Sequence, residues 1–257
     1  MEWIVEERGE VEVWTIDGAA RRNSITRAML AQLLAELQRA HGRRELRCVV
    51  LTGAGDRAFC AGADLKERAT MSEADVHAFH RDLRGALRGV ETSPKVFLAA
   101  INGVALGGGL ELALACDLRI MSAAAEVGLP EVGLGIIPGG GGTQRLPRAI
   151  GVARAKDLIL TGRRIDAVEA LAYGLATRAA PKEELRDAAL AMAAEVARNA
   201  PVSLRQAKRA VDDGLSLPLE QALDLENRMY QDCLKSRDRL EALKAFAQKR
   251  RPHFTGE

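Results

Sequence analysis

The sequence predicts an α/β protein with a helical C-terminal part, and three observations lead to this fold class. Short apolar runs alternate with helical patterns in the first 150 residues, which favours parallel strands joined by crossover helices. Beyond residue 151 the strand signals stop and helical patterns continue. Hydrophobic residues make up 47% of the 257 residues, which is enough for a large core and excludes a disordered chain.

Strand and helix signals follow one another along the chain. Strands are expected at 11–17, 48–52, 96–101 and 118–121. Thr26 is the expected N-cap of one helix, and the pair Ser72 and Asp75 resembles a capping box that opens a second helix ending near residue 90. In the C-terminal part, helices are expected at 152–160, 166–173, 182–199, 202–211, 219–233 and 237–248.

Composition excludes several classes of protein. The net charge is +2, from 37 basic and 35 acidic residues, which argues against a protein of nucleic acids or membrane surfaces. No run reaches the ~18 apolar residues of a membrane span, and the first residues are acidic where a targeting peptide is basic. The four cysteines are scattered and lack metal-ligand spacing, so we expect a cytoplasmic protein that holds no metal.

The stretch 99–117 contains the strongest functional signal. An apolar strand is followed by three glycines at 107–109 and then by an apolar helix with Glu111 in its first turn. Glycines allow a ligand to approach the backbone closely, and the first amides of a helix have no partner within it. A carboxylate beside such donors suits an acyl-group active site, although a glutamate in a first turn is also an ordinary partner of the helix dipole.

A second carboxylate, Glu131, follows Pro130 and also lies among glycines. The glycine run 139–142 lacks the Lys-Ser/Thr of a phosphate-binding loop, so we interpret it as a tight turn into the next helix. His77 and His80 have no third ligand in view and are expected on the surface. Two carboxylates facing one pocket would suit general acid–base chemistry beside a stabilised oxyanion.

Three ordered stretches resemble the enoyl-CoA hydratase/isomerase (crotonase) family, namely 59–67, 102–117 and 130–147. The resemblance extends from residue 11 to the C-terminus. It implies an α/β fold of stacked ββα units, a crotonase-like ββα superhelix, with a C-terminal helical trimerisation region. The α/β core with the active site would span 1–195, and the helical oligomerisation region 196–257. The homo-oligomer would be a trimer or a dimer of trimers.

The resemblance also implies the roles of individual residues. The amides of Ala63 and Gly108 would form an oxyanion hole for the thioester carbonyl. Glu111 would help to activate water for attack at the β-carbon, and Glu131 would supply the α-carbon proton. Coenzyme A would be bound by Arg22, Ala61, Asp64 and Leu65. No separate cofactor is expected, because coenzyme A is part of the acyl-CoA thioester substrate.

Within the family, 61–68, 107–117 and 136–150 are most similar to the AU-binding 3-methylglutaconyl-CoA hydratases of leucine breakdown. Lys66 or Arg68 would then meet the distal substrate carboxylate. Two alternatives stay open: a short-chain hydratase acting on crotonyl-CoA in fatty-acid oxidation, and an AU-rich RNA-binding protein with secondary hydratase activity. RNA-binding relatives carry a row of lysines on their first helix. We do not expect RNA binding here, because only Arg27 and Arg39 are basic on the corresponding helix.

Overall fold

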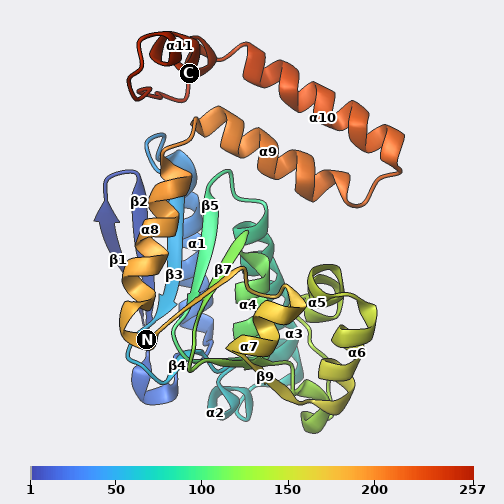
Figure 1. The fold of residues 1–257 in the computed structure, drawn as a ribbon. Coiled ribbons are helices and arrows are strands. Elements are labelled where there is room, and N and C mark those ends of the chain that lie inside the picture. The colour runs from blue at the N-terminus through green and yellow to red at the C-terminus, as the bar shows by residue number, and fades with distance from the viewer. Residues whose placement is uncertain (1) are drawn as a thin grey trace.

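The computed structural model describes residues 2–257, and two β-sheets form its centre (Figure 1). In the larger sheet all neighbours are parallel except the first pair. Its strands, in spatial order, are β1 (Glu2–Arg8), β2 (Val11–Asp17), β3 (Cys48–Gly53), β5 (Val96–Ile101), β7 (Leu118–Ser122) and β10 (Arg178–Ala180). The smaller sheet contains β4 (Ala58–Cys60), β6 (Val104–Leu106), β8 (Glu126–Gly128) and β9 (Arg164–Asp166).

The helices in the first half of the chain follow pairs of strands. They are α1 (Arg27–Gly42), α2 (Leu65–Arg68), α3 (Glu73–Glu91), α4 (Gly108–Ala115), the 3-10 turn η2 (Glu131–Leu134) and α5 (Gly142–Ile150). Each of the pairs β3–β4, β5–β6 and β7–β8 contributes one strand to each sheet before a helix follows. The expected repeat of ββα units is therefore confirmed, and it brings the ends of the three small-sheet strands β4, β6 and β8 together.

The large sheet is buried on both faces, which explains why its central strands β3 and β5 are nearly continuous apolar runs. In β5, Phe97 and Ala99 belong to the core shared with α1, α3 and α4, whereas Leu98 and Ala100 belong to the core shared with α8 (Leu185–Ala197). Successive side chains of a strand point to opposite faces, so one apolar run supplies both cores. The rigid centre fixes where the strands end and hence where the following turns lie.

Local sequence signals determined the element boundaries well. The four expected strands are confirmed to within one residue. The hydroxyl of Thr26 accepts from the amide of Met29, and Ser72 and Asp75 form the full capping box. The helix expected from residue 182 begins at Leu185, because a short 3-10 turn, η3 (Lys182–Glu184), follows Pro181. The sequence analysis missed β1 and the three-residue strands of the small sheet, which are too short to show a period.

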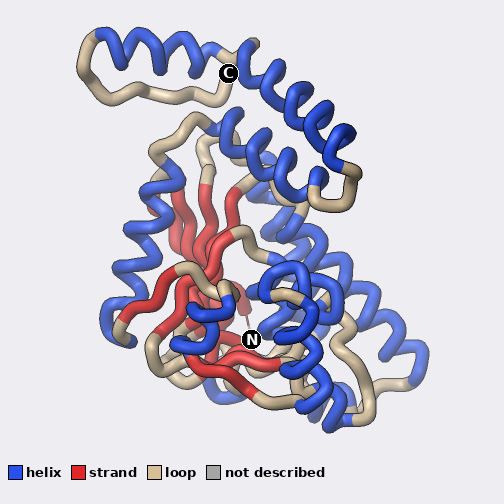
Figure 2. Tube along the Cα trace, turned by 45° about the vertical axis from the view of Figure 1, so that its right-hand side comes forward, coloured by secondary structure: helices blue, strands red, loops and turns tan. Residues whose placement is uncertain are grey.

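The remaining helices include α6 (Val152–Thr161), α7 (Ala167–Tyr173), α9 (Pro201–Gly214), α10 (Leu219–Leu234) and α11 (Arg237–Ala247), with the 3-10 turn η1 (Ala19–Arg21) earlier in the chain. Figures 1 and 2 show α9, α10 and α11 beyond one end of the large sheet, opposite the small sheet. The predicted boundary after residue 195 falls in the last turns of α8, and the division into two regions stays a prediction. Within residues 2–257, no helix has the length and apolar character needed to cross a membrane.

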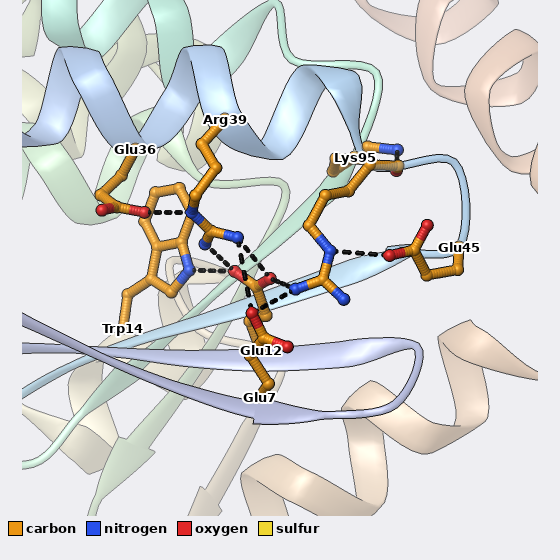
Figure 3. Close-up of polar contacts among 8 residues, drawn as sticks. Glu7, Glu12, Trp14, Glu36, Arg39, Glu45 and Lys95 are labelled. Carbon is orange, nitrogen blue, oxygen red and sulfur yellow. Dashed lines mark hydrogen bonds and ion pairs between the residues drawn. The ribbon is translucent and has the colours of Figure 1, made fainter.

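A buried carboxylate in β2, that of Glu12, joins the large sheet to α1. Glu12 has no exposed surface, and it accepts hydrogen bonds from Trp14 Nε1 at 2.7 Å and from Arg43 Nη1 at 2.7 Å. Figure 3 shows the indole of Trp14 and the guanidinium of Arg39 pointing toward this carboxylate. Burial alone would raise the pKa of Glu12, but the hydrogen bonds from Arg39 and Trp14 outweigh it and lower the pKa.

Replacing Glu12 with glutamine is expected to destabilise the fold at pH 7 by about 2–4 kcal/mol, because Arg39 and Arg43 lose a buried partner. A carboxylate whose pKa is lowered in the folded state stabilises the fold above its unfolded pKa, and this stabilisation is lost as the pH falls through the folded pKa. The difference in urea unfolding free energy between variant and wild type should therefore shrink as the pH falls below about 4.5.

Glu36→Gln is the matched control, since Glu36 also pairs with Arg39 but its side chain is partly exposed. We expect this variant to lose less than about 1 kcal/mol. Equal losses for the two variants would contradict the role given to Glu12.

Candidate active site

The start of α4 packs closely against the small sheet, and glycine is required at two of its positions, Gly107 and Gly109. Gly107, the N-cap, has a φ of 53°, in the region that favours glycine. A Cβ atom at Gly109 would overlap the carbonyl oxygen of Cys60 in β4. The close approach brings the first turn of α4 alongside the loop 61–65.

Two backbone amides at this junction, those of Ala63 and Gly108, lie on adjoining segments. The loop 61–65 is fixed by Ile25, whose amide donates to the carbonyl of Gly62 at 2.8 Å and whose carbonyl accepts from the amide of Asp64 at 2.9 Å. A Cβ built on Gly108 would lie 3.9 Å from the nitrogen of Ala63, so these two residues adjoin. Within residues 2–257, neither the Ala63 nor the Gly108 amide has a hydrogen-bond acceptor. Paired free donors of this kind can stabilise a negatively charged oxygen.

Glu111 lies in the first turn of α4 and is 2% exposed. Its Oε1 accepts a hydrogen bond from the amide of Gly142 at 2.8 Å, and a Cβ at Gly140 would lie 2.6 Å from its Oε2. Burial raises the pKa of Glu111, while the amides of Gly142 and Gly140 and the charges of Arg145 and His80 act in the opposite direction. The glycine loop 139–142 therefore holds this carboxylate through hydrogen bonds that favour its ionised form.

Glu131 begins η2 and is 8% exposed, but its environment differs from that of Glu111. Its Oε2 is buried and has no hydrogen-bond partner within the described residues. Burial, together with a smaller effect of the negative charge of Glu111, raises the pKa of Glu131 to about 7. The structure thus brings the two predicted carboxylates into one site and makes them unequal, with the proton favoured on Glu131.

The residues expected to bind coenzyme A gather at one loop. The amide of Ala61 donates to the carbonyl of Arg22 at 3.0 Å, and Leu65 is exposed. Asp64 is buried, and its carboxylate caps α2 through the amides of Lys66 and Glu67 and pairs with Arg21. The carboxylate of Asp64 therefore stabilises the conformation of the loop 61–65. Contact of these residues with coenzyme A stays a prediction.

The cations considered for other roles divide into two groups. Within residues 2–257, neither Lys66 nor Arg68 forms an ion pair, and the guanidinium of Arg68 lies 5.9 Å from the centroid of the Phe79 ring. On α1, Arg27 pairs with Glu67 and Asp75, and Arg39 pairs with the buried Glu12. The two basic residues of α1 are therefore already neutralised, which supports the expectation of weak or absent RNA binding.

Sequence reasoning missed three contributors to the site, all of which act on the glycine loop 139–142. The amide of Gly142 binds Glu111, Arg145 Nη1 donates to the carbonyl of Gly140 at 2.7 Å, and His80 Nε2 lies 2.8 Å from the carbonyl oxygen of Gly139. His80 is exposed, as expected, but it also contacts this loop. Only the glycine run itself was a signal, because Glu111 and His80 lie 31 and 59 residues from their partners in the loop, and the contact of the nearby Arg145 with Gly140 shows no sequence pattern.

Stacked ββα units with two carboxylates beside free backbone amides are the arrangement expected of enzymes that act on acyl thioesters. A family model described as "Enoyl-CoA hydratase/isomerase" matches residues 6–257, and the chain belongs to this family. It is an enzyme with enoyl-CoA hydratase/isomerase activity, of the hydro-lyase type, and its substrate is an acyl-CoA thioester.

Known proteins support this membership along the whole chain. "Probable enoyl-CoA hydratase 2, mitochondrial" of Arabidopsis thaliana is 44% identical over 96% of this chain and 82% of the relative. "Methylglutaconyl-CoA hydratase, mitochondrial" of Homo sapiens is 41% identical over 99% of this chain and 76% of the relative. The solved structure of an enoyl-CoA hydratase from Bacillus anthracis has a TM-score of 0.98 and 45% identity, with 100% of both chains covered.

Proposed function

We propose that this enzyme hydrates 3-methylglutaconyl-CoA to 3-hydroxy-3-methylglutaryl-CoA reversibly, in the breakdown of leucine. The sequence resemblance to that branch and the 41% identity with the human methylglutaconyl-CoA hydratase support this substrate. The similar identity with the Arabidopsis enoyl-CoA hydratase favours the alternative, a short-chain hydratase acting on crotonyl-CoA. Both substrates use the same chemistry, and they differ by one methyl group and one carboxylate on the acyl chain.

The observation that carries the mechanism is that the carboxyl groups of Glu111 and Glu131 differ in hydrogen bonding and in pKa. In our proposal the thioester oxygen accepts hydrogen bonds from the amides of Ala63 and Gly108, which stabilise negative charge on that oxygen as it develops. Glu111, ionised and held by the Gly142 amide, takes a proton from water while the water oxygen bonds to the β-carbon. The double-bond electrons pass to the thioester oxygen as an enolate.

Glu131 completes the addition. Burial and the charge of Glu111 keep its carboxyl protonated near neutral pH, and it donates this proton to the α-carbon as the enolate collapses. Glu111 ends protonated and Glu131 ends ionised, so one proton has moved through the pair and the site holds the same number of protons as before. The reverse reaction uses the same two groups with their roles exchanged.

The remaining site and assembly proposals follow from the same resemblance. Coenzyme A would bind along the loop 61–65 with Arg22 near its phosphates, and the reaction would need no metal and no separate cofactor. A homo-oligomer, a trimer or a dimer of trimers, would cover the apolar side chains that α9 to α11 expose, among them Leu215, Leu219, Leu240, Leu243 and Phe246. Cytoplasmic location stays a prediction, and relatives named above are mitochondrial.

The substrate is tested by following the conjugated-enoyl absorbance with 3-methylglutaconyl-CoA and, in parallel, crotonyl-CoA. We expect kcat/KM to be at least about tenfold higher for the branched diacid thioester, since a substrate carboxylate paired with a cation contributes more than 1 kcal/mol. Lys66→Gln and Arg68→Gln should lower kcat/KM for the diacid and leave crotonyl-CoA unchanged. Equal or faster hydration of crotonyl-CoA would exclude the proposed substrate and keep the mechanism.

A further inference from the structure

The glycine loop 139–142 that binds Glu111 has no rigidity of its own. Consecutive glycines lose more conformational freedom on folding than any other residues, and Gly141 has a φ of 111°. The geometry of the loop must therefore be fixed by contacts from outside. The structure provides these contacts through the side chains of Arg145 and His80.

Arg145 makes the most extensive of these contacts. Its guanidinium is 17% exposed and donates through Nε and Nη2 to the two carboxylate oxygens of Glu91, each at 2.8 Å. The third nitrogen, Nη1, donates to the carbonyl of Gly140 at 2.7 Å. Glu91 is the last residue of α3, and Arg145 is the fourth residue of α5. This planar three-point arrangement ties the glycine loop to two helices at once.

The same loop also contacts Glu111 at two positions. The amide of Gly142 donates to Oε1 of Glu111, and the α-carbon of Gly140 lies so close that a methyl group there would meet Oε2 at 2.6 Å. A rotation of the Gly140 peptide would move the donors that face the carboxylate. The position of Glu111 therefore depends on the Gly140 carbonyl staying where Arg145 holds it.

We propose that Arg145, itself held by Glu91, is a positioning residue that fixes the glycine loop 139–142 and thereby aims the carboxylate of Glu111 at the attacking water. This inference rests on the hydratase mechanism proposed above and adds two residues to it. Arg145 acts through the loop and does not touch the reacting atoms. His80, on the carbonyl of Gly139, is a second and more exposed contact of the same loop.

Charge as well as geometry would change without Arg145. The charged groups facing Glu111 are Arg145 from α5, His80 from α3 and Glu131 from η2. Burial raises the pKa of Glu111, and Arg145 is one of the groups that limit this rise. Removal of Arg145 would therefore raise the pKa of Glu111 further and move the acid limb of the kcat/KM profile to higher pH.

The test compares Arg145→Gln, Arg145→Lys and Glu91→Gln with wild type, using whichever enoyl-CoA the wild type hydrates. We expect Arg145→Gln to lower kcat about 100-fold, as misplacement of a catalytic group by roughly 1 Å does, with a smaller change in KM. Glu91→Gln should lower kcat about tenfold. Arg145→Lys keeps the charge but not the planar fork, so it should leave most of the loss in place.

Arg148→Gln is the matched control, because Arg148 is an exposed arginine of the same helix whose Nη1 donates to the carbonyl of Gln144 and not to the glycine loop. It should hydrate at the wild-type rate. Full activity and an unchanged acid limb in Arg145→Gln would overturn the proposal. If that variant does not fold, Glu91→Gln carries the test, and wild-type kinetics there would overturn the proposal equally.

A second measurement separates this inference from the proposed reaction. The Glu111 carboxyl can be titrated by infrared difference spectroscopy, with the band assigned by its loss in Glu111→Gln. We expect its midpoint to shift to higher pH in Arg145→Gln, whatever thioester the enzyme prefers. If the wild type is an active hydratase and Arg145→Gln shows neither the pKa shift nor a loss of kcat, the positioning role of Arg145 is rejected while the proposed reaction stands. If the wild type does not hydrate the thioesters but the Glu111 midpoint still shifts in Arg145→Gln, the proposed reaction is rejected while the positioning role of Arg145 stands.

Discussion

Glu131→Gln is expected to lower kcat for hydration by about 10²–10⁴-fold, because the amide cannot donate the proton that the enolate requires. Glu111→Gln should cause a loss of similar size, since an amide cannot take the proton from water. The two losses should not add in the double variant, because the carboxylates act as a unit. Stopped-flow measurement of the enoyl absorbance gives all three values. Nearly full activity in either single variant would contradict the paired mechanism.

The same pair predicts the pH dependence. The active state holds one proton on the two carboxyl groups, so kcat/KM should be bell-shaped, with its alkaline limb near the pKa of about 7 at Glu131. Hydration neither consumes nor releases protons, so the reverse reaction must show the same two limbs. A profile that stays flat from pH 6 to pH 9 would contradict the assignment of the proton to Glu131.

Glu131→Gln should lower activity but raise the free energy of unfolding at alkaline pH. The pKa of Glu131 is higher in the folded protein than its ordinary value of 4.5, so the folded state holds the proton more tightly. This group favours folding below its unfolded pKa, and that contribution is lost as the pH rises through about 7. At pH 8 the glutamine variant should be more stable than wild type, by about 1–3 kcal/mol, as measured by urea unfolding.

Gly108→Pro is expected to lower kcat about 10²–10³-fold, because it removes one of the two amides that we propose for the oxyanion hole. Gly108 is the first residue of α4, a position where proline is tolerated because its missing N–H has no partner within the helix. The variant should therefore keep the fold. Its circular dichroism spectrum and melting temperature check this.

Gly108→Ala is the matched control, since it keeps the amide. Its added methyl group would meet the end of the Ile25 side chain at 3.0 Å, which can move aside. This variant should retain at least about a tenth of the wild-type rate. Equal activity of the proline and alanine variants would show that the Gly108 amide does not stabilise the oxyanion.

The fold was predictable where its signals were local. The caps at Thr26 and Ser72 each depend on a hydrogen bond to a residue three positions ahead, so the sequence contains both partners. The apolar runs of β3 and β5 are equally local. The three-residue strands of the small sheet were missed because they are formed by pairing with segments far away and show no period of their own.

The sequence by itself determined the α/β class, the helical C-terminal part, and the two glutamates among glycines that carry the candidate chemistry. These depend on residue types and on spacings of a few residues, which a pattern displays directly. Only the tertiary structure decided that Glu111 accepts a hydrogen bond from the Gly142 amide and that Glu131 has an unpaired buried oxygen. It also decided that Glu91 holds Arg145, which in turn contacts the glycine loop. Burial and charge act through space, so the unequal protonation of two glutamates twenty residues apart arises only once the chain is folded around them.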